Sequence, residues 1–210
     1  MANRIGQVYG LTIFSPLLES DGMDTEHASS VRRYLGTLSR NKSSPFARVS
    51  GTHFARLVVM DDVVFVGAPA REEHLQSRYL VFEANFDGDL DKYLDSMARE
   101  IPGEVDSIWK HCVGYPGVAN AAAFAAYMKK CQVETTFFFA DVCDRTVPEI
   151  LRALQVQSAL AHFIEKNQGR PATEIQMAFG VWLEGLSIVP SLLPGGVDSQ
   201  TAASKESVDG

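Results

Sequence analysis

Two stretches of the sequence decide the fold: Thr52-His53-Phe54-Ala55-Arg56-Leu57-Val58-Val59-Met60-Asp61-Asp62 and Arg78-Tyr79-Leu80-Val81-Phe82-Glu83-Ala84-Asn85-Phe86-Asp87-Gly88. Both are rich in the β-branched and aromatic residues that favour strands. Both also carry ionisable side chains in their interiors, whereas a strand buried on both faces is a continuous apolar run. The two stretches therefore predict strands of a sheet with one apolar face and one partly polar face.

Successive side chains of a strand point to opposite faces, so each stretch can be sorted into two sets. In the second stretch one set is wholly apolar and is expected to lie under helices: Leu80, Phe82, Ala84 and Phe86. The other set is more polar and is expected on the open face: Tyr79, Val81, Glu83 and Asn85. In the first stretch, packing of Leu57 under the helices would place Arg56 on the open face beside Glu83. The alternative register places His53 there instead.

The rest of the chain predicts further elements by the spacing of its apolar residues. Strands are expected over 9–14 and 133–140. Helices are expected over 24–39, 90–101, 118–130 and 146–166, and in the first half of 175–193.

The ends of these elements are predicted from capping and helix-breaking residues. Asp24 or Thr25 is expected to cap the first helix. The second helix is expected to start at Asp87 or Asp89 and to end at Pro102-Gly103. The connection over 63–77 is longer than a hairpin turn, and we expect it to form a flap over the open face.

This order of elements matches an α+β fold: the ferredoxin-like split βαβ of the dimeric α/β-barrel type, with extra C-terminal helices. We expect one domain over 1–193, followed by a disordered tail over 194–210. Helices cover one face of such a sheet, and a second subunit, extra helices or a ligand cover the other. A homodimer is therefore expected. A three-layer α/β sheet is disfavoured because no helix separates the two stretches quoted above.

The composition argues against several classes of protein. The 210 residues carry a formal charge of −7, whereas a nucleic-acid-binding protein needs a basic surface. Cys112, Cys131 and Cys143 lack the spacing of a zinc site, so no metal site and no disulfide framework is predicted, and reduced thiols indicate the cytoplasm. The sequence shows no signal peptide, and no apolar run is long enough for a membrane span.

The polar positions of the open face are the first candidates for a functional site. Arg56 and Glu83 would form a charge-assisted pair that orients a ligand, and Glu83 would act as a general base if burial raises its pKa. His53 is a further candidate for catalysis, and Asn85 and Tyr79 are candidates for binding the ligand. The structural alternative is that Arg56 and Glu83 only pair across two strands, as many ion pairs do without catalysis.

A second candidate segment is His111-Cys112-Val113-Gly114-Tyr115-Pro116-Gly117, in which His111 and Tyr115 are expected to bind a ligand. Adjacent side chains point apart, which disfavours a Cys112 thiolate paired with the neighbouring imidazole. The structural alternative is a rigid turn at Tyr115-Pro116-Gly117. The chain has no GxGxxG, P-loop, HExxH or CxxCH motif, so dinucleotide, triphosphate, zinc-protease and c-type haem sites have no motif to support them.

These segments resemble a group of bacterial proteins that has no settled activity: His53-Phe54-Ala55-Arg56, Asn85-Phe86-Asp87-Gly88 and His111 to Gly117 carry the resemblance. Members of the group are found beside, or fused to, haem peroxidase-like and lipoxygenase-like proteins. Ala84-Asn85-Phe86-Asp87-Gly88 is also similar to the GxxDG motif of the ferredoxin-like domains of dye-decolourising peroxidases, although Ala84 replaces the first glycine.

Three functions are expected from these observations. The first is a small-molecule-binding protein or enzyme with a cavity on the open sheet face, acting on an oxygenated or lipophilic metabolite in an oxidative pathway. The second is a non-catalytic accessory module that binds an oxidative enzyme. The third, implied by the resemblance, is a haem-binding protein that uses His53 or His111.

Overall fold

The computed structural model describes residues 3–19 and 26–187. The described residues form two compact units, divided between Val147 and Pro148. None of the helices in the described part of the chain combines the length and the apolar character that a membrane span requires.

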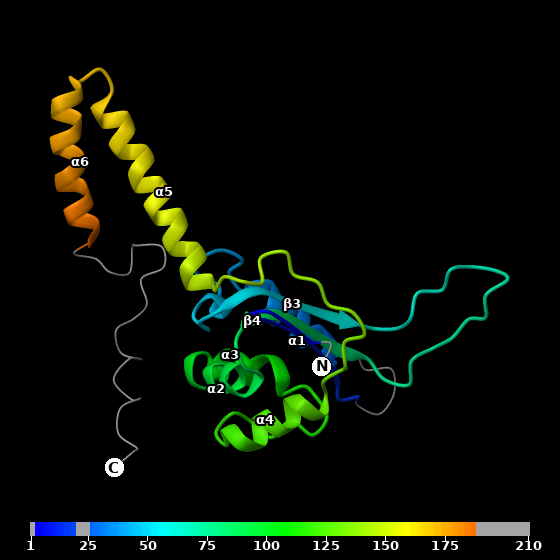
Figure 1. Ribbon diagram of the computed structural model, residues 1–210. Helices are drawn as coiled ribbons and strands as arrows, with labels where there is room; N and C mark the ends of the chain where they lie inside the picture. The colour runs from blue at the N-terminus through cyan, green and yellow to red at the C-terminus, as the bar shows by residue number, and fades with distance from the viewer. Residues whose placement is uncertain (1–2, 20–25, 188–210) are drawn as a thin grey trace, which may run out of the picture. The chain divides into compact units, whose positions relative to one another are not determined.

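The first unit is built on a four-stranded sheet (Figure 1). Its strands are β1 (Arg4–Ile5), β2 (Val8–Pro16), β3 (Thr52–Met60) and β4 (Tyr79–Asp87), in the order β1-β2-β4-β3. Because β4 is antiparallel to both of its neighbours, β2 and β3 run in the same direction on either side of it. The α+β class and the first three predicted strands are confirmed.

The helices of this unit pack on one face of the sheet. They are α1 (Glu26–Thr37), α2 (Leu90–Glu100), α3 (Pro102–Trp109) and α4 (Ala121–Lys130), with a 3-10 turn, η1 (Pro45–Ala47). Each α-helix contributes to a single core, for example through Val31, Leu94, Trp109 and Phe124. The helices predicted over 24–39, 90–101 and 118–130 are confirmed. The predicted caps Asp24 and Thr25 lie outside the described residues.

The side chains of β4 alternate as predicted. Its apolar set is fully buried under the helices: Leu80, Phe82, Ala84 and Phe86. Phe82 packs edge-on against Trp109, with the ring centroids 5.4 Å apart. Leu57 of β3 packs against the same core, whereas Phe54 and Val58 are exposed on the opposite face.

Both predicted ends of α2 are confirmed, but the helix that follows it was not predicted. α2 ends at Glu100, before Pro102. Pro102 also begins α3, because a proline in the first turn of a helix loses no hydrogen bond. The cap of α2 is Asp89, whose side chain accepts the N–H of Asp91 at 2.9 Å. Asp87, the alternative start, is bonded elsewhere.

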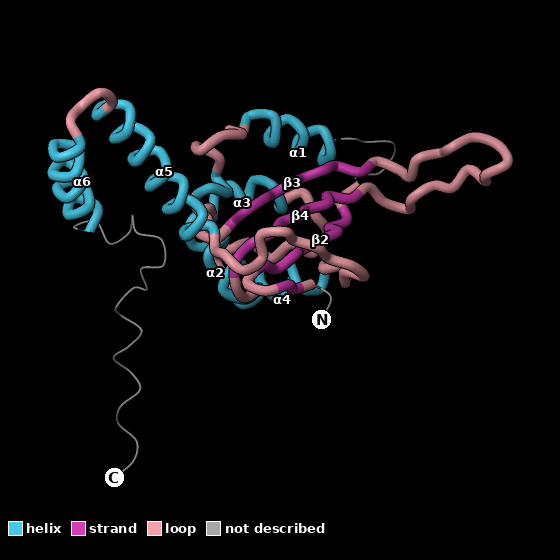
Figure 2. The backbone as a smooth tube through the Cα atoms, turned by 45° about the horizontal axis from the view of Figure 1, so that its top comes forward, coloured by secondary structure: helices cyan, strands magenta, loops and turns pink. Residues whose placement is uncertain are grey.

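The strand predicted over 133–140 is wrong. β1 occupies one end of the free edge of β2, opposite Val8 and Tyr9, and Phe138 packs onto Gly10 instead of pairing along the rest of that edge. Only Gln132 pairs there, as an isolated bridge to Ile13. The chain then leaves the edge and passes over the open face as an irregular stretch (Figure 2). We refer to residues 133–143 as the crossing segment.

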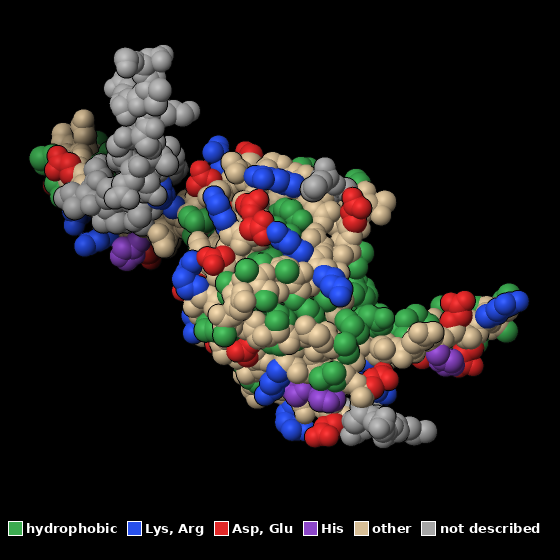
Figure 3. All heavy atoms as spheres, turned by 90° about the horizontal axis from the view of Figure 1, so that it is seen from below, with side chains coloured by type: hydrophobic (Ala, Val, Ile, Leu, Met, Phe, Trp, Pro, Cys, Tyr) green, Lys and Arg blue, Asp and Glu red, His purple; other side chains and the backbone are tan. Residues whose placement is uncertain are grey.

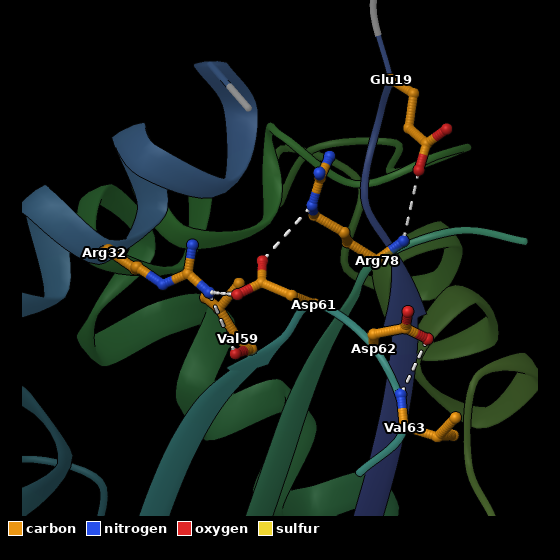
Figure 4. Close-up of polar contacts among 7 residues, drawn as sticks. All are labelled: Glu19, Arg32, Val59, Asp61, Asp62, Val63 and Arg78. Atoms are coloured by element: carbon orange, nitrogen blue, oxygen red, sulfur yellow. Dashed lines mark hydrogen bonds and ion pairs between the residues drawn. The ribbon is translucent and has the colours of Figure 1, made fainter. Parts of the chain in front are cut away.

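The loop over 61–78 projects away from the sheet, so the expectation of a flap over the open face is wrong (Figure 1). Val64 and Val66 are 87% and 81% exposed. Figure 3 shows apolar side chains toward the base of this loop and charged ones toward its tip. At the base, Asp61 forms ion pairs with Arg32 of α1 and with Arg78, whose Nε lies 3.3 Å from Asp61 Oδ1 (Figure 4). These pairs join the two ends of the loop to each other and to α1.

The second unit consists of α5 (Val147–Asn167) and α6 (Ala172–Ser187), and both predicted helices are confirmed. Gly169, with a φ of 78°, lies in the turn between them, where a left-handed residue commonly follows a helix. The rings of Phe163 and Trp182 pack between the helices, with centroids 5.5 Å apart. The predicted tail over 194–210 lies outside the described residues.

Candidate functional site

A cavity of about 530 Å³ lies on the open face of the sheet, against the crossing segment. Its lining combines Gly10, Leu11 and Thr12 of β2 with Phe54, Arg56, Glu83 and Asn85 of β3 and β4, and with Thr135, Phe137, Phe138 and Phe139 of the crossing segment. Strand alternation brings Arg56, Glu83 and Asn85 to this face. The structure therefore places three of the predicted site residues in one cavity.

Arg56 and Glu83 form an ion pair in the lining of this cavity. They lie directly opposite each other in the antiparallel register of β3 and β4. The Arg56 side chain is 59% exposed and the Glu83 side chain 30%, so water and salt screen their attraction. A ligand that brings its own charge can compete for either partner. The planar guanidinium offers two parallel donors to a carboxylate.

The other walls combine polar groups with phenyl rings. Asn85 contributes an amide, and Thr12 and Thr135 contribute hydroxyl groups. In the crossing segment, Phe137 is 83% exposed and Phe139 67% exposed. Large apolar side chains that remain exposed beside a few convergent polar groups are typical of a binding surface. This lining suits a ligand with a polar head and an apolar body.

Gly10 allows the crossing segment to lie close to the sheet. A Cβ atom at this position would come within 2.9 Å of the ring of Phe138. A glycine inside a strand often marks such a close approach. The segment is also fastened at Thr135, whose N–H donates to Oδ1 of Asn3 at 3.1 Å.

His53 does not line the cavity. A bulge between Thr52 and Phe54 makes His53 an extra residue of β3. Its Nε2 lies 2.7 Å from Oδ1 of Asp87, and Oδ2 of Asp87 accepts the N–H of Val147 at 2.7 Å. The Asp87 carboxylate thus links β3 to the end of the first unit, and this bond directs the His53 imidazole to Asp87.

Tyr79 and His111 also lie apart from the cavity lining. Tyr79, at the start of β4, packs edge-on against Phe14, with centroids 6.1 Å apart. His111 follows α3, and its Nδ1 lies 3.0 Å from Nδ1 of His27. The structure therefore does not bring these two residues together with Arg56.

Tyr115 and Cys112 belong to the helical layer. The Tyr115 hydroxyl donates to Oδ1 of Asp106 at 2.7 Å, and burial raises the pKa of Tyr115. The same oxygen accepts the N–H of Val118 at 3.1 Å, so the turn is fastened to α3, as in the structural alternative. Burial raises the pKa of Cys112 to about 12, so its thiol stays protonated at neutral pH.

Sequence reasoning missed the crossing segment as a wall of the cavity. The β-propensity of Phe137-Phe138-Phe139 predicts a strand and thereby hides this role. Gly10, in the middle of the first predicted strand, is the signal that a chain segment approaches the sheet closely there.

A second groove, of about 600 Å³, lies between α1 and β3. Arg32, Arg40 and Arg56 contribute to it, but none of its lining residues is a carboxylate. Because Arg32 is paired with Asp61, this groove offers less for acid–base chemistry than the cavity on the open face.

Within residues 3–19 and 26–187, no three His, Cys, Asp or Glu side chains are grouped to hold a metal ion. His53 and His111 each contact another side chain and neither lines the cavity, and a haem ligand at either histidine stays a prediction. In comparisons with known proteins, the chain matches no family model, no curated protein and no solved structure.

Proposed function

We propose that the first unit is a cytoplasmic protein that binds a small organic molecule on the open face of its sheet. One observation carries this proposal: the Arg56–Glu83 pair and the Asn85 amide line the same cavity as four phenylalanine side chains. Its volume of about 530 Å³ falls within the range of about 300–1,000 Å³ that is usual for small-molecule sites.

The ligand that fits this lining has an oxygenated head and an apolar body. A carboxylate or similar oxyanion would bind the Arg56 guanidinium through two hydrogen bonds. The side chains of Phe54, Phe137 and Phe139 would contact the apolar body. An aromatic ligand body would pack well against these phenyl rings. The resemblance to proteins found beside peroxidase-like and lipoxygenase-like enzymes favours a metabolite of an oxidative pathway.

Catalysis at this site would use Glu83 as the base. A ligand anion bound to Arg56 would take the guanidinium away from Glu83 and leave the carboxylate able to accept a proton from the ligand. His53 is the second candidate base, and it would first have to leave Asp87.

We further propose that the first unit is a ferredoxin-like split βαβ unit that pairs with a second copy. The parallel strands β2 and β3 flank β4, and α1 connects them, as in a split βαβ unit. Val58, which is exposed and does not line the cavity, would be covered by the partner. Light scattering should then give the mass of a dimer. A monomer at high protein concentration would contradict the pairing.

The binding proposal can be tested with three simple probes: benzoate, phenylacetate and benzyl alcohol. Calorimetry with the full chain should show that the carboxylates bind more tightly than the alcohol. Arg56→Ala should weaken carboxylate binding by about tenfold or more, because a charge-assisted contact is lost. Glu83→Gln should strengthen it, because the competing carboxylate is removed.

Arg48→Ala is the matched control, since Arg48 is an exposed arginine that pairs with Glu104 and does not line the cavity. Its carboxylate binding should equal that of the wild type. The proposal is contradicted if no probe binds at millimolar concentration, or if Arg48→Ala and Arg56→Ala weaken carboxylate binding equally.

A second candidate function is a protein-interaction module in the second unit. The helices α5 and α6 expose large apolar side chains: Leu151, Leu154, Ile164, Met177 and Val181. A two-helix hairpin rarely buries its apolar surface alone. We therefore propose that this unit binds another protein, in line with an accessory role beside an oxidative enzyme.

Replacement of both Leu154 and Val181 by Gln tests this role. The double variant should abolish co-purification of the other protein, while phenylacetate binding and the dimer mass of the chain stay unchanged. Association equal to that of the wild type would exclude these helices as the interaction surface.

A further inference from the structure

His27 and His111 face each other from two separately anchored segments. His27 lies in the first turn of α1, where the neighbouring Ala28 is buried in the core. His111 follows α3, and its carbonyl oxygen accepts the N–H of Leu18 at 2.8 Å. Both histidines are half-buried. The backbones that carry the two rings are therefore anchored independently of the contact between the rings.

The two Nδ1 atoms lie 3.0 Å apart, and the rings are tilted by 59°. Two nitrogen ligands that bind one metal ion at about 2.0–2.1 Å lie about 2.9–3.4 Å from each other. The observed separation of His27 and His111 falls in that range. A small adjustment of the rings would let both lone pairs point at one ion.

We propose that His27 and His111 are the two protein ligands of an exchangeable divalent transition-metal ion. Neutral imidazole suits Zn²⁺, Ni²⁺ and Cu²⁺, whereas Mg²⁺ and Ca²⁺ prefer oxygen ligands. No third ligand is grouped with them among the described residues, so water completes the coordination shell. Such an ion exchanges readily and differs in this respect from a structural zinc ion with four protein ligands. The site is independent of the cavity on the open face.

A metal ion between the two Nδ1 atoms would take the place of the proton that a hydrogen bond between them requires. In such a bond one of two neutral rings is protonated at Nδ1. When the ion binds, that proton leaves Nδ1 and a proton is taken up at Nε2 of the same ring. Both rings then remain neutral, and no net proton is released.

Nuclear magnetic resonance of the histidine rings with Zn²⁺ as the probe tests this site. The sample is the full chain without a polyhistidine tag, at about pH 7.5, where neutral imidazole predominates. One equivalent of Zn²⁺ should bring both His27 and His111 to the tautomer protonated at Nε2. The ring nitrogens of His53 and His162 should not shift. Unchanged His27 and His111 rings at millimolar Zn²⁺ would overturn the proposal.

Variants give a second, quantitative readout. His27→Ala and His111→Ala should each weaken Zn²⁺ binding by about tenfold or more, because even the loss of an outer contact to a metal ligand can cost that much. His162→Ala is the control, since His162 is exposed on α5, and its affinity should equal that of the wild type. Equal affinity in His27→Ala and the wild type would also overturn the proposal. If a variant fails to fold, the wild-type ring signals decide.

Discussion

The ring of Phe138 lies directly against the backbone of Gly10 in β2. A Cβ atom at position 10 would approach the ring to 2.9 Å, which is closer than a carbon–carbon contact allows. Phe138 lies in the middle of the crossing segment, so this contact determines how closely the segment approaches the sheet. The shape of the cavity therefore depends on the absence of a side chain in a strand.

Gly10→Ala should push Phe138 away from the sheet. We expect the free energy of unfolding to fall by about 1–2 kcal/mol, as for other overpacked sites, and phenylacetate binding to weaken. Gly36→Ala is a control for which the free energy of unfolding should rise, because Gly36 lies in α1 and an added Cβ atom would meet open space. It should stabilise the chain by about 0.5–1 kcal/mol. Urea unfolding measures both, and a Gly10→Ala protein as stable as the wild type would contradict the contact.

Phe82 and Phe137 should respond to truncation in opposite ways. Phe82 is fully buried against Phe46 and Trp109, so Phe82→Ala should reduce the free energy of unfolding by about 3–5 kcal/mol. Phe137→Ala should change stability by less than about 0.5 kcal/mol but weaken phenylacetate binding. Denaturant unfolding and calorimetry separate the two effects. If Phe137→Ala binds phenylacetate as tightly as the wild type, the Phe137 ring does not contact the ligand.

The loop over 61–78 should contain a pH-sensitive contact between Asp62 and His74. A hydrogen bond from His74, then the N–H groups of Leu75 and Val63, lower the pKa of Asp62 to about 2, and the bond to Asp62 raises the pKa of His74. The contribution of the Asp62 carboxylate to the stability of the folded state is complete above its ordinary pKa of 3.8 and is lost as pH falls through about 2. The contribution of the protonated His74 ring to stability is complete below its ordinary pKa of 6.5 and is lost as pH rises through its raised pKa.

This contact is therefore complete between about pH 3.8 and 6.5. Titration of the His74 ring by nuclear magnetic resonance should show a raised pKa in the wild type and a lower one in Asp62→Asn. The same His74 titration midpoint in both proteins would show that the pair does not form.

Cys112 should be almost inert in the folded protein. With a pKa of about 12, its thiolate fraction at pH 8 is about 10⁻⁴. Alkylation by iodoacetamide should therefore be slower at Cys112 than at a free thiol of ordinary pKa by about a hundredfold or more. Peptide mapping by mass spectrometry measures the rate, and unfolding in guanidinium should abolish the difference. Fast alkylation of Cys112 in the folded chain would contradict this prediction and make Cys112 a candidate nucleophile again.

Much of the sheet could be predicted because residues such as Phe82 and Glu83 alternate between a buried and an exposed face. The same alternation places Arg56 beside Glu83. Alternation could not locate His53, because a bulge adds one residue to the strand and the side chains no longer alternate between the two faces there. Bulges leave no reliable mark in the sequence.

The crossing segment could not be predicted because local propensity and tertiary context disagree. Phe137, Phe138 and Phe139 favour a strand, but the edge of β2 that such a strand needs is partly occupied by β1. α2 ends before Pro102 as predicted, but α3 was not predicted, since proline either ends a helix or begins the next. Only the path of the chain after α2 decides between these outcomes.

The most direct test of the proposed function is a map of where phenylacetate binds on the full chain. Backbone amide signals in nuclear magnetic resonance should shift most at Gly10, Thr12, Glu83, Asn85 and Phe138, around the cavity on the open face. The absence of shifts at millimolar phenylacetate, or largest shifts in the groove between α1 and β3 or in α5 and α6, would contradict it.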